Sequence, residues 1–126
     1  MPKVLLVDDD PLHSFVRMSV LEQRFPNVQR VADAAEAFCL VEQSGFADDL
    51  GLVISGHHRP GISGPAFVAE LRLRMPFLPI LVLINGNETR GDYPTEPLHF
   101  LRKPVSNEEI LSLVSVIMAQ NERMIA

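Results

Sequence analysis

Five short runs of mostly apolar residues are spaced along the chain, and segments with a different hydrophobic pattern separate them. The runs cover residues 4–7, 28–31, 50–55, 80–84 and 98–102. Most of them are continuous instead of alternating with polar residues, which is typical of strands buried on both faces of a parallel sheet. The run at 28–31 is the weakest, because Gln29 and Arg30 interrupt it.

The segments between these runs carry apolar residues at helical spacing. The first begins after Asp10, and its apolar stripe, with Met18 and Phe25 beside it, predicts a broadly buried helix. The stripe consists of Leu12, Phe15, Val16, Ser19 and Val20. A second helix is expected from about Ala34, with Gly45 just past its end, and a third over residues 64–75. Ser106 and Glu109 form a capping box at the start of the last helix.

Strands that alternate with helices indicate right-handed βαβ units. The predicted fold is therefore α/β, with a doubly wound five-stranded parallel sheet and helices on both faces. The segment between the fourth and fifth strands, residues 85–97, contains two prolines, two glycines and almost nothing apolar. We expect the fourth helix to be short or irregular there.

Length and charge limit the classes of function. The chain has 126 residues and is expected to form one domain over residues 1–126, beginning at a genuine start, Met1. Its net charge of −5 argues against binding of nucleic acid or an anionic membrane by this chain alone. A lone cysteine, Cys39, and an apolar run after Lys3 too short for a signal core favour a cytoplasmic location.

Three consecutive carboxylates, Asp8, Asp9 and Asp10, follow the first strand. The carboxyl ends of parallel strands form the edge at which ligands bind, and crowded carboxylates repel one another unless a cation such as Mg²⁺ or a basic side chain joins them. Asp10 precedes Pro11 and is explained as the N-cap of the first helix. Asp8 and Asp9 are therefore the candidate site residues.

Three motifs in this order resemble the response-regulator receiver domain of two-component signalling. They are Val7-Asp8-Asp9-Asp10, the Pro60-Gly61-Ile62-Ser63-Gly64 loop after the third strand, and Lys103-Pro104 after the fifth. The resemblance covers nearly the whole chain and implies a flavodoxin-like sheet of the receiver type. It also implies a site that accepts a phosphoryl group from a phosphohistidine kinase.

The resemblance assigns roles to several residues. Asp8 and Asp9 match the acidic pair that holds Mg²⁺, and Lys103, with Pro104 in a cis bond, matches the lysine that steadies the transferred charge. Phe100 falls at the switch aromatic position. The backbone carbonyl of His58 stands where the family supplies a metal ligand.

Two positions depart from the family. The nucleophilic aspartate falls on Gly56, and the switch hydroxyl falls on Ile84. A glycine supplies no attacking oxygen. Ser55 is expected to point to the opposite side of the sheet. Lys103 is then expected to form salt bridges with Asp8 or Asp9, with metal binding limited to weak Mg²⁺ or absent.

These departures predict a phosphorylation-independent, receiver-like module that is not an enzyme and needs no cofactor. It is expected to contact another signalling protein or an effector domain, held in one state by packing of Ile84 and Phe100. Three apolar residues of the last helix lie off its core stripe: Leu113, Val116 and Met124. They are candidate contacts with a partner or in a homodimer. The alternative is that they are partly buried against the irregular loop.

Three other interpretations remain open. A functional phosphoreceiver with an unusual acceptor is one. A small phosphatase of the haloacid-dehalogenase type is suggested by Asp8-x-Asp10, although it leaves the loop at 60–64 unexplained. His57 and His58 beside the acidic pair suggest a Zn²⁺ site, but adjacent loop residues seldom point at one ion, so exposed loop residues are favoured.

Overall fold

The computed structural model describes residues 2–56, 62–84, 93 and 98–125, the last five by backbone alone. Five strands form a single parallel sheet in the order β2-β1-β3-β4-β5. The strands are β1 (Lys3–Val7), β2 (Val28–Val31), β3 (Leu50–Gly56), β4 (Ile80–Ile84) and β5 (Leu98–Arg102). All five strands predicted from the apolar runs are present, within one residue at each end.

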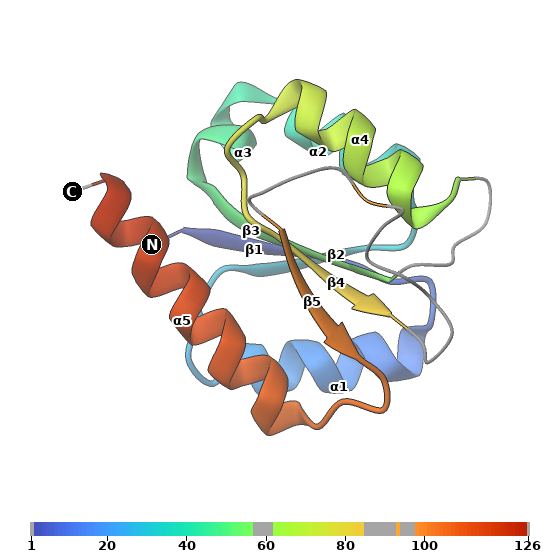
Figure 1. Cartoon of the computed structure of the whole chain (residues 1–126), viewed down its shortest axis with the longest axis vertical. Helices are drawn as coiled ribbons and strands as arrows, with labels where there is room; N and C mark the ends of the chain where they lie inside the picture. Colours follow the sequence, from blue (N-terminus) through green and yellow to red (C-terminus); the bar gives the residue numbers. More distant parts are fainter. Residues whose placement is uncertain (1, 57–61, 85–92, 94–97, 126) are drawn as a thin grey trace.

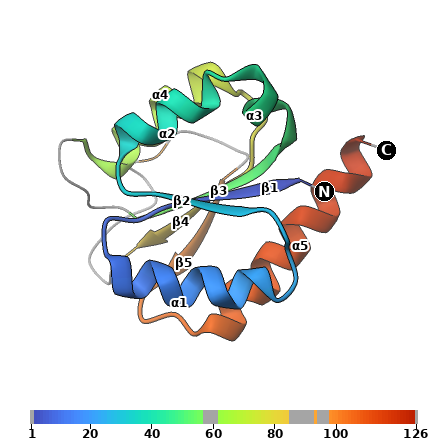
Figure 2. The same cartoon turned by 180° about the vertical axis from the view of Figure 1, so that it is seen from behind.

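Five helices accompany the sheet among the described residues: α1 (Pro11–Glu22), α2 (Ala34–Val41), α3 (Ser44–Asp49), α4 (Gly64–Arg74) and α5 (Asn107–Ile125). Figures 1 and 2 show α2, α3 and α4 on one face of the sheet and α1 and α5 on the other. The doubly wound fold is therefore confirmed. The short or irregular helix expected within residues 85–97 lies outside the described residues, apart from Tyr93.

Two hydrophobic clusters, one on each face, hold the layers together. Central strands alternate between them: Val53 and Val82 face α2 and α4, whereas Ile54 and Leu83 face α1 and α5. Strands buried on both faces explain the continuous apolar runs in the sequence. None of the helices in the described residues has the length and apolarity needed to cross a membrane.

Helix α1 buries a different face from the one predicted. The expected inward residues Leu12 and Phe15 are 79% and 72% exposed, and Val16 is half exposed, whereas Ser14 and Leu21 are buried. The predicted stripe followed the apolar residues Leu12, Phe15 and Val16, and this choice put Ser14 on the outer face. Ser14 is buried because its hydroxyl donates to the carbonyl of Asp10, at 2.7 Å, so no polar group is left unsatisfied.

The expected end of the second helix at Gly45 is also wrong. Helix α2 ends at Val41, and Gly45 lies inside the additional helix α3. Phe46 of α3 is buried in the cluster under α2 and α4, and this tertiary contact outweighs the low helix propensity of Gly45.

The predicted caps are confirmed. The Asp10 carboxylate accepts from the backbone N–H groups of Leu12 and His13 at the start of α1. Ser106 and Glu109 form the reciprocal capping box of α5, with the Glu109 N–H donating to the Ser106 hydroxyl at 3.1 Å. Both caps fix where a helix leaves the carboxyl edge of the sheet.

Candidate functional site

Strand register gathers the candidate residues at the carboxyl edge of the sheet. Val7 pairs with Ser55, so Asp8 follows β1 beside the end of β3 at Gly56. Gly56 in turn pairs with Leu83. On the far side, the backbone N–H of Lys103 donates to the carbonyl of Ile84 at 2.7 Å, which brings the residue after β5 to the same edge.

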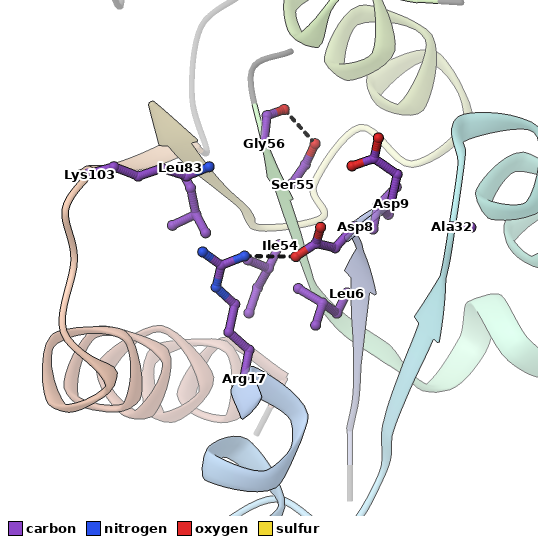
Figure 3. Close-up of a pocket in the computed structure, with 11 residues that line it drawn as sticks. Leu6, Asp8, Asp9, Arg17, Ala32, Ile54, Ser55, Gly56, Leu83 and Lys103 are labelled. Carbon is purple, nitrogen blue, oxygen red and sulfur yellow. Dashed lines mark hydrogen bonds and ion pairs between the residues drawn. The ribbon is translucent and has the colours of Figure 1, made fainter. Parts of the chain in front are cut away.

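An ion pair between Asp8 and Arg17 is the central contact of this site (Figure 3). Arg17 Nη1 donates to Asp8 Oδ2 at 2.7 Å, and the two side chains are only 16% and 12% exposed. The other carboxylate oxygen, Asp8 Oδ1, accepts from the backbone N–H of Asp10 at 2.9 Å. Both oxygens of Asp8 therefore have protein donors.

A second arginine fixes the backbone of the same aspartate. Arg30 of β2 donates from Nε and Nη2 to the carbonyl oxygen of Asp8, at 3.1 and 2.9 Å. The Asp8 N–H donates to the carbonyl of Val31 at 3.0 Å. Asp8 is thus held through side chain and main chain, whereas the neighbouring Asp9 is exposed.

A small cavity of about 60 Å³ lies beside this ion pair. Lys103 and Gly56 line it together with both aspartates and Arg17. Gly56 contributes no side chain, and among the described lining residues only Asp8 and Asp9 are carboxylates. The cavity is large enough for a few water molecules.

Ser55, next to Gly56 at the end of β3, is also among the residues that line this cavity. Its hydroxyl is buried and donates to the carbonyl of Gly56 at 3.0 Å. That hydrogen bond commits the hydroxyl proton to the main chain.

Lys103 lies at the acidic pocket but, among the described residues, does not form the salt bridges expected for it. The Lys103–Pro104 peptide bond is cis, as the resemblance implied. In the part of the chain that the structure describes, however, the Lys103 ammonium forms no ion pair with Asp8 or Asp9, although it lines the same cavity. Arg17 is the partner of Asp8 instead. Sequence reasoning missed Arg17 because the predicted inner stripe of α1 followed the apolar residues and did not include this arginine.

Ile84 and Phe100 lie together on the α2 and α4 side of the sheet. Ile84 is 1% exposed, and Phe100 is partly buried against the same cluster. The ring of Tyr93 packs edge-on against Phe100. The aromatic position of β5 is therefore packed inward, next to the strand end that carries Ile84.

The residues present do not fit a divalent metal such as Mg²⁺. A hard cation needs several oxygen ligands, but Asp8 is already paired with the Arg17 guanidinium and Gly56 supplies no carboxylate. Among described residues, no group of three or more histidine, cysteine, aspartate or glutamate side chains is arranged to hold a metal ion. His57 and His58, which entered the zinc hypothesis and the carbonyl-ligand prediction, lie outside the described residues.

Comparison with known proteins then decides the fold. A response regulator receiver domain protein from Clostridium thermocellum superimposes with a TM-score of 0.83, covering 98% of this chain and 99% of that one at 16% identity. The chain has the receiver-domain fold of response regulators. A probable two-component response regulator/GGDEF domain protein matches this receiver fold with a TM-score of 0.81 and 25% identity, over 97% of this chain and 51% of that one.

Sequence comparison gives a relative that this chain matches over part of its length. The glycerol metabolism activator of Pseudomonas putida is 29% identical over 83 residues, which are 66% of this chain and 37% of the activator. The match thus spans little more than a third of that protein's length. No family model matches the chain.

Proposed function

We propose that this chain is a receiver-like signalling module that works without phosphorylation, through contact with another signalling protein or an effector domain. One observation carries the proposal: β3 ends at the cavity with Gly56, which has no side chain to accept a phosphoryl group. A transferable phosphoryl group needs an attacking oxygen. The remaining carboxylates at the cavity, Asp8 and Asp9, follow β1 and not β3, and Asp8 is paired with Arg17.

The interaction surface that the structure favours lies on α1. Leu12 and Phe15 project from its outer side and are largely exposed, with Val16 beside them. A groove of about 570 Å³ adjoins this side and is lined by His13, Val16, Arg17, Lys103, Pro104, Val105 and Asn107. Large apolar side chains grouped on one surface are typical of protein-interaction sites.

Helix α5 offers less apolar surface than the sequence indicated. Val116 is 52% exposed, but Leu113 is half buried against the α1 and α5 cluster. Met124 belongs to the five residues described by backbone alone. The homodimer suggested through the last helix therefore rests on one described exposed residue, and α1 is the better supported surface.

Mass spectrometry of the intact protein tests the central proposal. The wild-type chain is incubated with acetyl phosphate and Mg²⁺, alongside a receiver domain that carries the acceptor aspartate. We expect the mass increase of one phosphoryl group in the reference domain only. A stoichiometric increase in this chain contradicts a phosphorylation-independent function.

A second candidate function, a phosphoreceiver with an unusual acceptor, is favoured by the position of Ser55. Ser55 lines the cavity, although its hydroxyl is buried and donates to the Gly56 carbonyl. The variant Ser55→Ala decides the matter if the wild-type chain is phosphorylated, because loss of the mass increase identifies the acceptor. The phosphatase hypothesis is not retained, since the Asp10 carboxylate caps α1 and the chain has the receiver-domain fold.

A further inference from the structure

The contacts of Asp8 supply the site with a cation from within the chain. Arg17 projects from α1 onto the acidic pair and places a guanidinium group against Asp8 Oδ2 (Figure 3). At 84% side-chain burial, this guanidinium is held by the fold and is not a mobile surface group. The second oxygen accepts from the Asp10 N–H, so each oxygen of this carboxylate already has one protein donor.

The charges around the cavity also disfavour a bound divalent cation. The ionisable lining side chains are two acids, Asp8 and Asp9, and two bases, Arg17 and Lys103, which sum to zero. Arg30 adds a further positive charge at the Asp8 carbonyl. A divalent cation placed on Asp8 meets these positive charges at close range, in a partly buried setting where repulsion is weakly screened.

We propose that Arg17 is the built-in counter-cation of the acidic pair, and that it closes the site to divalent metal ions. The guanidinium lies against Asp8 Oδ2, one of the two carboxylate oxygens available to a metal, and its attachment to α1 ties that helix to the end of β1. In this arrangement the charge of the acidic pair is balanced by the protein itself, and the structure of the site does not depend on the Mg²⁺ concentration. Replacement of Arg17 by a neutral side chain is then expected to create a divalent-cation site.

Titration of three chains with Mg²⁺ and Mn²⁺ tests this proposal. Calorimetry reports Mg²⁺ binding, and paramagnetic broadening of backbone amide signals locates Mn²⁺ in the wild type, Arg17→Met and Arg17→Lys. We expect no saturable Mg²⁺ binding at the acidic pair in the wild type or Arg17→Lys. In Arg17→Met we expect saturable Mg²⁺ binding with an affinity about tenfold or more above the upper limit measured for the wild type, because one full positive charge next to the ion is removed.

Two further variants control the result. Arg24→Met removes another arginine near the end of α1, one that bonds to Ser115 instead of Asp8, and should leave metal binding unchanged. Arg17→Met with Asp8→Asn and Asp9→Asn should lose the new site. Amide spectra establish that each variant is folded.

Saturable Mg²⁺ binding by the wild type with broadening at Asp8 overturns the proposal, even if Arg17→Met does not fold. So does equal affinity in the wild type and a folded Arg17→Met. Metal binding is measured apart from phosphoryl transfer. A wild-type chain that binds Mg²⁺ but is not phosphorylated therefore contradicts the role of Arg17 and leaves the proposed function intact.

Discussion

Arg17 and Asp8 form an ion pair in which each side chain is more than four-fifths buried, with Nη1 and Oδ2 2.7 Å apart. The pair joins the first turns of α1 to the end of β1. Because water is largely excluded, loss of either partner leaves a charge that solvent compensates poorly. The pair is therefore a structural contact as well as the electrostatic centre of the site.

Adjacent aspartates provide a matched test of this contact. Asp8→Ala is expected to lower the free energy of unfolding by about 2 kcal/mol, since it leaves the Arg17 guanidinium without its carboxylate. Asp9→Ala removes an exposed carboxylate and should change stability by less than about 0.5 kcal/mol. Urea unfolding of both variants measures the difference. Equal effects contradict a structural role for the Asp8–Arg17 pair.

The N-cap of α1 predicts a pH dependence. The hydrogen bond from the His13 N–H lowers the pKa of Asp10 below its ordinary value, with the Leu12 N–H contributing in the same direction. A carboxyl group with a lowered folded-state pKa stabilises the fold above its unfolded pKa, and this contribution is lost as pH falls through the folded-state pKa.

Asp10→Asn keeps a capping oxygen but does not titrate, so it isolates this effect. The stability advantage of the wild type over Asp10→Asn should be present at pH 7 and shrink as the pH drops below about 4. Urea unfolding of both proteins across this range measures it. An advantage that grows on acidification contradicts the lowered pKa.

Burial of Ile84 predicts how its substitution changes the free energy of unfolding. Ile84→Thr buries a hydroxyl in an apolar cluster and is expected to destabilise the chain by about 2 kcal/mol. Ile84→Val removes one methylene group and should cost about 1 kcal/mol. Denaturant unfolding separates the two. If threonine costs no more than valine, the site tolerates a hydroxyl and Ile84 does not lock the strand end through apolar packing.

The exposed side of α1 predicts where partner binding is sensitive. Leu12→Glu with Phe15→Glu should reduce partner recovery at least about tenfold while leaving stability within about 0.5 kcal/mol, because both side chains are exposed. Val116→Glu on α5 is the matched control. Quantitative affinity capture reports the partner, and sedimentation velocity reports self-association. Loss of binding only in Val116→Glu moves the interaction surface to α5.

Restoring an acceptor alone should not restore phosphorylation. Gly56→Asp supplies the missing carboxylate, but Arg17 remains paired with Asp8 and hinders Mg²⁺ binding there. The reaction with acetyl phosphate and Mg²⁺ is therefore expected to be slow. The double variant Gly56→Asp with Arg17→Met should react at least about tenfold faster, since a metal ion assists phosphoryl transfer by neutralising the developing charge. Intact-mass time courses measure both rates. Equal rates argue that Arg17 does not control the chemistry of this edge.

The amino-acid sequence by itself determined the five strands, their assembly into a parallel sheet and the caps at Asp10 and Ser106. Each of these depends on short runs and local spacing, since a strand buried on both faces reads as a continuous apolar run and a cap involves residues three apart. The gathering of Asp8, Gly56 and Lys103 also followed, because parallel strands end at one edge.

Only the tertiary structure decided which face α1 buries and which base pairs with Asp8. The polar Ser14 can turn inward because its hydroxyl donates a hydrogen bond to the Asp10 backbone carbonyl, and Leu12 and Phe15 then lie outside. The same orientation of the helix places Arg17 against Asp8, so that Arg17 and not Lys103 forms the ion pair. Hydrophobic periodicity does not register a polar group whose partner is supplied by the fold, so these contacts became apparent only when the helix was packed on the sheet.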